Sequence, residues 1–359
     1  MRTTIHTPPS SDEARGYSCP PTGRSAAARA VAALLVGALV AFGCSPAART
    51  TIPPDATGST APVATGTPVP AFPVTLTDDE GTSVTIPAEP TKVVSLTPAT
   101  TELLYKLGVA HRIVAKVEDP AHYPPESDSI LNVAKYGSVD VEKIVGLGAD
   151  LVIAGGNTFT PPEAIAQLRS LKVPTIVVYA PTVAKVFEDV ALTGQAVGRG
   201  DAARDLVTSM RAQFDQIGAA TRNANKPRTW YEIDATGAFY GPADDSFLAE
   251  MIRLAGGDPI TTGSPNKFDI PAERLLKADP EVILLGDAAY GVTAAQVAAR
   301  PGWKTMTAVA RNAIKPIDDI VVTRPGPRLV DGLQAIMAAI HPELVSASPG
   351  ASAGESAAP

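Results

Sequence analysis

The sequence of 359 residues predicts an α/β fold made of two lobes that are joined by one long helix. Predicted strands alternate with predicted helices through residues 92–178 and again through 228–340, which is typical of parallel sheets. Residues 142–153 align without gaps on residues 273–284, so the lobes share a plan, although any helix-to-strand unit gives such a match. Between them, apolar residues recur at helical spacing through 201–222, a helix of about 33 Å.

The first lobe is expected over residues 72–200 and opens with a hairpin, because two alternating segments flank an acidic turn that ends in Gly81. Gly108 then ends the first helix. The expected hairpin strands are 74–77 and 83–86; the remaining strands are 92–96, 113–116, 151–154 and 175–178, with helices at 100–107, 141–147 and 162–171.

The connector is expected over residues 201–224 and the second lobe over 225–343. Gly200 is predicted to end one helix, and Asp201 to be the N-cap of the connector. A single rigid connector predicts little hinge motion between the lobes. The second lobe should contain strands at 228–233, 282–285 and 314–317, with helices at 246–255, 272–277, 293–310 and 328–340.

The N-terminus has the features of an export signal. Arg15, Arg24 and Arg29 flank an apolar stretch, Ala30 to Phe42, that is too short to span a bilayer of about 30 Å as a helix. The stretch ends in Gly43-Cys44, which resembles the bacterial lipobox and implies lipidation of Cys44; an ordinary cleaved signal with a chance cysteine is the alternative. Residues 1–43 are therefore interpreted as a lipoprotein signal peptide. Residues 44–71 and 344–359, rich in Pro, Ala, Ser and Gly, are expected to be a disordered tether and tail.

Composition excludes several classes of function. A formal net charge of -7 and a pI near 5.2 argue against nucleic-acid binding, which needs a basic surface. Both cysteines, Cys19 and Cys44, precede the folded part, so no internal disulfide or thiolate metal site is expected there. No catalytic motif is present, and neither a cofactor nor an enzymatic activity is predicted. A lipid-anchored hydrolase and an adhesion or scaffold module remain as rivals, which turnover assays and ligand-induced thermal shifts would separate.

Several segments, in this order and spacing, resemble the class III periplasmic binding proteins, which serve importers of cobalamin, haem and iron–siderophores. The resemblance covers about residues 72–343, and it implies two Rossmann-like lobes on one connector helix with the ligand between them. It also implies an extracytoplasmic, monomeric protein that delivers its ligand to an ABC permease with a cytoplasmic ATPase. The Tyr-Pro-Pro-Glu segment is most similar to cobalamin-binding members, so a corrinoid is expected, with a ferric siderophore or haem as the alternative. The segments are 93–98, 101–104, 123–126, 141–144, 150–154 and 324–328.

The resemblance indicates three ligand-binding residues, Tyr136, Tyr240 and Arg324. The two tyrosines match aromatic positions on opposite walls in the cobalamin-binding relative, and flat aromatic faces suit a macrocycle. Arg324 matches a ligand-contacting arginine there. The alternatives are loop tyrosines packed on a lobe surface and, for Arg324, a loop salt bridge to Asp318 or Asp319.

The sequence also departs from the relative at two aromatic pocket positions, which are Gly155 and Lys267 here. His122 is a further candidate, as an axial ligand to haem iron, although a surface-loop histidine is the simpler interpretation. No other metal ligand is expected.

Glu142 and Glu273 occupy the same place in the two matching segments, each at the start of a predicted helix. An acid there is favoured by the helix dipole alone. The resemblance implies a second role, because acids at these positions in the cobalamin system meet arginine pockets on a two-fold symmetric permease.

Overall fold

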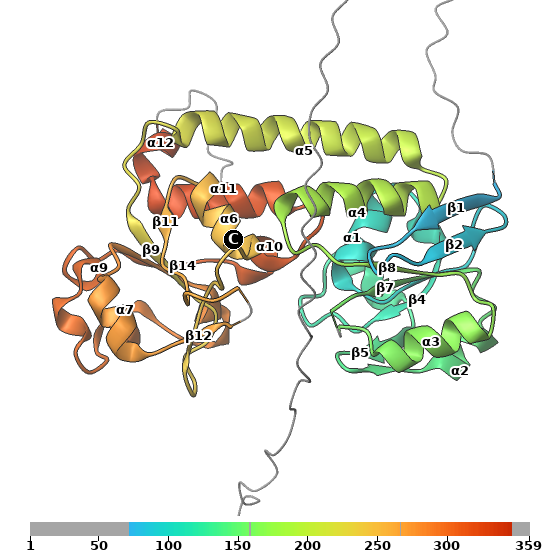
Figure 1. Cartoon of the computed structure of the whole chain (residues 1–359), viewed down its shortest axis with the longest axis horizontal. Coiled ribbons are helices and arrows are strands. Elements are labelled where there is room, and N and C mark those ends of the chain that lie inside the picture. The colour runs from blue at the N-terminus through green and yellow to red at the C-terminus, as the bar shows by residue number, and fades with distance from the viewer. Residues whose placement is uncertain (1–71, 158, 266, 347–359) are drawn as a thin grey trace, which may run out of the picture. The chain divides into compact units, whose positions relative to one another are not determined.

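The computed structural model describes residues 72–346, except 158 and 266. Three interpretations therefore lie outside the described residues: the signal peptide at 1–43, the tether at 44–71 with the lipidated Cys44, and the part of the expected tail at 347–359. The described part has the predicted α/β fold, with one main, mostly parallel sheet in each of two lobes (Figure 1). Within it, none of the helices combines the length and apolar character needed to cross a membrane.

The N-terminal lobe is built on a six-stranded sheet of order β6-β5-β4-β3-β7-β8, parallel except for β6. Alternate residues of the central strand β7 face two apolar layers, Leu151 and Ile153 on one side, Val152 and Ala154 on the other. Helices cover both faces, which explains why β7 is buried throughout. The strands are β3 (Val93–Ser95), β4 (Ile113–Val117), β5 (Asn132–Lys135), β6 (Ser138–Val139), β7 (Leu151–Gly155) and β8 (Thr175–Val178).

Four helices and an antiparallel hairpin complete this lobe. The hairpin pairs β1 with β2, as predicted. Ile144 of α2 packs in the layer opposite the one that contains Leu103 of α1. The elements are β1 (Val74–Thr77), β2 (Ser83–Ile86), α1 (Pro98–Lys106), α2 (Val141–Gly146), α3 (Pro162–Ser170) and α4 (Val183–Ala196).

The C-terminal lobe repeats this plan on a four-stranded parallel sheet of order β11-β9-β13-β14. Strand β13 lies between β9 and β14, just as β7 lies between β3 and β8, so the segments that match in sequence occupy equivalent places. A small antiparallel sheet, β10 (Phe239–Tyr240) with β12 (Asp269–Ile270), is added to it. The parallel strands are β9 (Arg228–Glu232), β11 (Asp258–Pro259), β13 (Val282–Leu285) and β14 (Ile314–Pro316).

Seven helices belong to the C-terminal lobe. The single helix predicted over residues 293–310 is wrong: two α-helices and a 3₁₀ turn lie there, because Gly302 adopts a positive φ of 81°. Helix α12 occupies residues that were expected to begin a structureless tail. The α-helices are α6 (Phe247–Leu254), α7 (Ala272–Ala278), α8 (Ala294–Ala298), α9 (Thr307–Ala310), α10 (Asp319–Thr323), α11 (Leu329–Ile340) and α12 (Pro342–Ser346).

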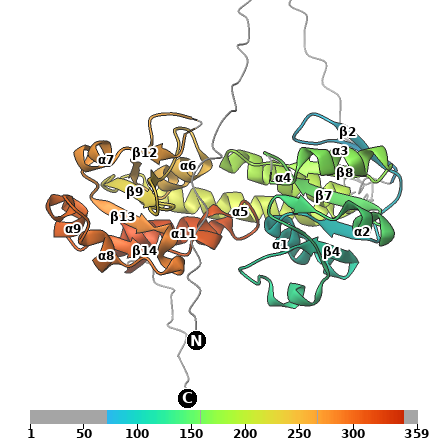
Figure 2. The same ribbon diagram turned by 90° about the horizontal axis from the view of Figure 1, so that it is seen from below.

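The long helix α5 (Gly200–Thr221) runs along both lobes (Figures 1 and 2). Ala203 packs in the core of the first lobe and Met210 in that of the second, while Leu206 touches both cores. The predicted N-cap is wrong, since Arg199 occupies that position and Asp201 lies inside the first turn. Gly194 of α4 explains the tight junction, because a side chain there would collide with Ala203.

Candidate functional site

A cavity of about 720 Å³ lies between the two lobes. Its walls come from the loops that follow β3, β7 and β8 in one lobe and β9 and β14 in the other. This is the carboxyl edge of parallel strands, where open α/β sheets bind ligands. The volume falls in the usual range of about 300–1,000 Å³ for small-molecule sites.

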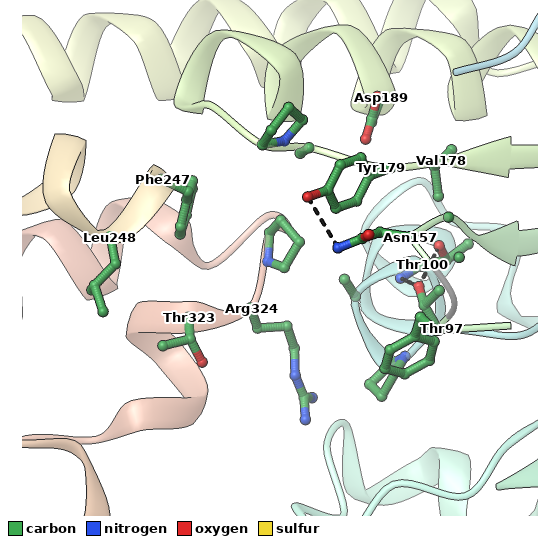
Figure 3. Close-up of a pocket in the computed structure, with 18 of the residues that line it drawn as sticks. Thr97, Thr100, Asn157, Val178, Tyr179, Asp189, Phe247, Leu248, Thr323 and Arg324 are labelled. Carbon is green, nitrogen blue, oxygen red and sulfur yellow. Dashed lines mark hydrogen bonds between the residues drawn. The ribbon is translucent and has the colours of Figure 1, made fainter. Parts of the chain in front are cut away.

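The floor of the cavity on the N-terminal lobe depends on two glycines at the end of β7. A Cβ at Gly155 would lie 2.7 Å from Thr97, and one at Gly156 would lie 2.9 Å from Tyr179. Without those atoms the Tyr179 ring packs close to the strand end, and Asn157 Nδ2 donates a hydrogen bond of 3.2 Å to its hydroxyl (Figure 3). The chain has Gly155 where the cobalamin-binding relative has an aromatic residue, and the Tyr179 ring lies next to this position instead.

Aromatic side chains dominate the cavity walls. Tyr136 stands in the tight turn between β5 and β6, is 78% exposed at the mouth, and meets Phe159 edge-on at 5.7 Å. Phe247 and Phe268 contribute from the C-terminal lobe. Five aromatic residues therefore face one cavity in a chain with only 5% aromatics, an arrangement suited to flat apolar surfaces.

Tyr240 does not line this cavity. Its neighbour Phe239 packs on Trp303 at 5.3 Å between ring centres, and alternation along the strand sends Tyr240 to the other side, where it is 38% exposed. Phe268, whose carbonyl accepts a 2.8 Å hydrogen bond from Gly241 N, lies at the cavity wall instead. We therefore take Phe268, and not Tyr240, as the aromatic residue of this wall.

Arg324 lines the cavity, but its guanidinium is bound to carboxylates. Nη1 donates to Glu102 Oε1 at 2.6 Å and to Asp119 Oδ2 at 3.0 Å, and Nη2 donates to Asp119 Oδ1 at 2.9 Å. Figure 3 shows the side chain extending away from Tyr179 and Asp189. Arg324 therefore does not form the alternative salt bridge to Asp318 or Asp319. Its carboxylate partners, Glu102 and Asp119, belong to the opposite lobe.

Arg328 completes what we call the interlobe cluster, which comprises Glu102, Asp119, Arg324 and Arg328. Its Nε and Nη2 each donate to Glu102 at 2.8 Å, and its guanidinium lies 3.6 Å from the centre of the Tyr123 ring. Burial acts to raise the pKa of Asp119, yet hydrogen bonds from Arg324 and Ala121 hold that pKa below its usual value. Two acids and two bases thus balance in charge and join α1 and the 119 loop to the 324–328 loop.

The other candidate positions lie outside the cavity. His122 is exposed and its Nδ1 pairs with Asp128 at 3.1 Å, and Lys267 is an exposed partner of Asp269 at 3.0 Å. Glu142 and Glu273 occupy the first turns of α2 and α7. Both glutamates are exposed, and neither has an ion-pair partner among the described residues.

Several cavity residues were not predicted from the sequence, among them Asp189, Phe247 and Phe268. Phe247 is the first residue of α6, directly after the N-cap Ser246, and the start of this helix was predicted. An aromatic residue at that helix start could therefore have been proposed as a cavity residue from the sequence. Asp189 lies in the helix α4, for which no start and a wrong end were predicted, since α4 ends at Ala196 and Gly200 is the first residue of α5. No local pattern marks Phe268, since its position depends on a two-stranded sheet formed across the lobe.

A sequence family described as periplasmic binding protein matches residues 93–321. A protein named an uncharacterized ABC transporter substrate-binding lipoprotein, YvrC, from Bacillus subtilis is 30% identical over 87% of this chain and 96% of its own length. A cobalamin-binding protein from Halobacterium salinarum is 26% identical over 76% of this chain and 75% of its own length.

Solved structures support the same fold. The periplasmic vitamin B12 binding protein BtuF of Vibrio cholerae superposes with a TM-score of 0.61 at 21% identity, covering 72% of this chain and 99% of that one. The periplasmic heme-binding protein RhuT from Roseiflexus sp. RS-1 gives a TM-score of 0.62 at 24% identity, covering 70% of this chain and 98% of that one. At these identities the similarity shows the fold alone, and the two solved proteins, which share that fold, are named for different ligands.

Proposed function

This chain belongs to the periplasmic binding protein family, as a substrate-binding protein of ABC importers and not an enzyme, and we propose that its ligand is cobalamin or a closely related corrinoid. In this proposal the protein is lipid-anchored on the outer face of the cell membrane and delivers the corrinoid to its permease. A ferric siderophore or haem is the alternative ligand of the same class of importer.

The observation that carries the ligand proposal is the combination of aromatic walls with a lack of available positive charge. Of the described residues that line the cavity, Arg324 is the one cation, and both of its carboxylate partners are buried. Haem and catecholate siderophores carry negative groups, which a buried site must pair with a cation or pay for in desolvation. A corrinoid presents a flat ring edged with uncharged amides, which needs apolar area and hydrogen bonds instead.

Titration calorimetry of the purified protein tests the ligand. We expect cyanocobalamin to bind with a dissociation constant of about 1 μM or below, corresponding to about 8 kcal/mol, and haemin or a ferric tricatecholate to bind at least about 100-fold more weakly. Tight binding of haemin or of the tricatecholate, with no heat from cyanocobalamin at about 100 μM, would identify the alternative ligand class and refute the corrinoid.

The lipid-anchor proposal rests on the apolar stretch before Cys44 and on its small preceding residue. If it is correct, protein extracted from membranes begins at a Cys44 that carries a diacylglyceryl group, and Cys44→Ser is released into the soluble fraction. Intact-mass spectrometry of the two proteins measures this directly. A wild-type N-terminus at another residue, without lipid, would support the ordinary cleaved signal.

We further propose that Glu142 and Glu273 are the contacts to the permease. Ile144 and Leu275, on the same helices, pack in the layers on the sheet faces opposite those that contact α5. In Figure 1, α2 and α7 accordingly lie on the side away from α5, one on each lobe. Two acids at equivalent places suit a symmetric permease that offers two equivalent basic sites.

A further inference from the structure

The α4 wall of the cavity carries two polar side chains that the proposed function has not used. Asp189 and Thr193 are four residues apart, so they share one face of the helix, and both line the cavity among apolar neighbours such as Val178 and Val190. Asp189 is only 9% exposed and Thr193 only 1%. Figure 3 shows Asp189 above Tyr179 at the top of the cavity.

As a carboxylate, Asp189 would be poorly satisfied. Its Oδ1 is closed off from solvent without a hydrogen-bond partner, and the nearest cation, Lys185 Nζ, lies 3.7 Å away. Lys185 instead binds Asp79 at 2.6 Å and Glu188 at 3.1 Å. The Thr193 hydroxyl also has no hydrogen-bond partner among the described residues. Buried polar groups are seldom left unpaired, so this wall is short of partners.

Burial raises the pKa of Asp189 to about 9, and the Asp79 carboxylate nearby adds to the rise. Asp189 is therefore uncharged at neutral pH, while the neighbouring Asp79 carboxylate accepts from Tyr179 N and pairs with Lys185. The wall thus presents two uncharged groups, the Asp189 carboxyl and the Thr193 hydroxyl, and neither supplies a positive charge. Such a surface can accept hydrogen bonds from the N–H or O–H groups of a ligand, whereas an anionic oxygen finds no cation here and lies close to the Asp79 carboxylate.

We propose that Asp189 is a specificity-determining residue, which together with Thr193 selects ligands that present uncharged N–H groups, such as primary amides, over ligands that present carboxylates or catecholates. The inference rests on the proposed function, because it assumes that the transported ligand occupies this cavity. It goes further because it assigns the discrimination between uncharged and anionic ligands mainly to one side chain. It applies to any uncharged ligand that presents N–H groups, and not to a corrinoid alone.

The test measures four ligands on three variants. The ligands are cyanocobalamin and an uncharged ferric trihydroxamate on one side, haemin and a ferric tricatecholate on the other. Asp189→Leu removes the acceptor at similar volume, Asp189→Asn keeps an acceptor and adds a donor, and Glu188→Gln is the matched control. Glu188 lies on the same helix with the same Lys185 partner, but its side chain is 64% exposed and does not line the cavity.

We expect Asp189→Leu to weaken the uncharged ligand that wild type binds by about 10- to 100-fold, the loss of one or two hydrogen bonds. Asp189→Asn should keep that affinity within about threefold and bind haemin about tenfold better, because the amide has two N–H donors where the carboxyl has one O–H, and the additional one can donate to a propionate. Glu188→Gln should match wild type. The gain for haemin in Asp189→Asn is a readout of its own if Asp189→Leu does not fold.

The two proposals fail in different ways. Binding of the trihydroxamate in place of cyanocobalamin, weakened by Asp189→Leu, removes the corrinoid and supports the role of Asp189. Cyanocobalamin binding that Asp189→Leu leaves unchanged, or an Asp189→Asn protein with no gain for haemin, overturns the role of Asp189 and leaves the corrinoid in place. A wild-type protein that prefers the anionic ligands overturns both.

Discussion

Replacing Glu102 with alanine is expected to lower the free energy of unfolding by about 3–5 kcal/mol, because it leaves two mostly buried guanidinium groups without their shared carboxylate. The Glu102 side chain is only 2% exposed and accepts from Arg324 once and from Arg328 twice. Removing one partner of a buried ion pair costs more than the pair contributes, since the remaining charges stay desolvated. Urea unfolding followed by circular dichroism measures the change.

Glu118 provides the matched control, since it is exposed in the loop next to Asp119 and its side chain has no hydrogen-bond or ion-pair partner among the described residues. Glu118→Ala should change the unfolding free energy by no more than about 0.5 kcal/mol. Small-angle scattering adds a second readout, because loss of the interlobe cluster should widen the distribution of radii of gyration. If Glu102→Ala unfolds like the control and scatters like wild type, the cluster does not hold the lobes together.

The interlobe cluster also shows where prediction from sequence stops. Glu102 and Arg324 are 222 residues apart, and no local pattern connects them. The resemblance indicated that Arg324 lies at the ligand, but the hydrogen-bond partners of its guanidinium depend on which carboxylates the other lobe supplies. Tyr240 illustrates the same limit, since pairing of β10 with β12 decides the side on which its ring lies.

Elements with strong local patterns were predicted well. The strand β7 and the helix α5 each follow an apolar period. Strand β7 ends one residue later than predicted, and α5 begins one residue before the predicted connector, 201–224, and ends three residues before its end. The extent of helix α4 was not predicted, although Val183, Val186, Phe187 and Val190 follow a helical spacing. Asp189 and Gly194 on that helix are residues that do not favour helices. Gly194 leaves room for Ala203 of α5, and Asp189 lies one turn from Lys185, on the face that lines the cavity.

The second large effect concerns transport. Glu142→Ala and Glu273→Ala should each reduce uptake of the ligand by about tenfold, and the double variant by more, while ligand affinity stays unchanged. Each glutamate sits at an exposed first helical turn, free of ion pairs with the described residues, so its removal frees no buried partner. Uptake of radiolabelled cyanocobalamin in cells, together with calorimetry on the purified variants, separates transport from binding.

Glu163 is the control for this experiment, because it is an exposed acid in the first turn of α3 that falls outside the matching segments. A contribution from the helix dipole alone would make Glu163→Ala and Glu142→Ala equivalent, with small losses of stability of about 0.5 kcal/mol and no loss of uptake. Permease contact predicts that they differ. Normal uptake by the double variant contradicts the docking role, because the two glutamates would then not be needed for transport. A double variant that no longer binds ligand also contradicts it, because the loss of uptake would then come from the cavity.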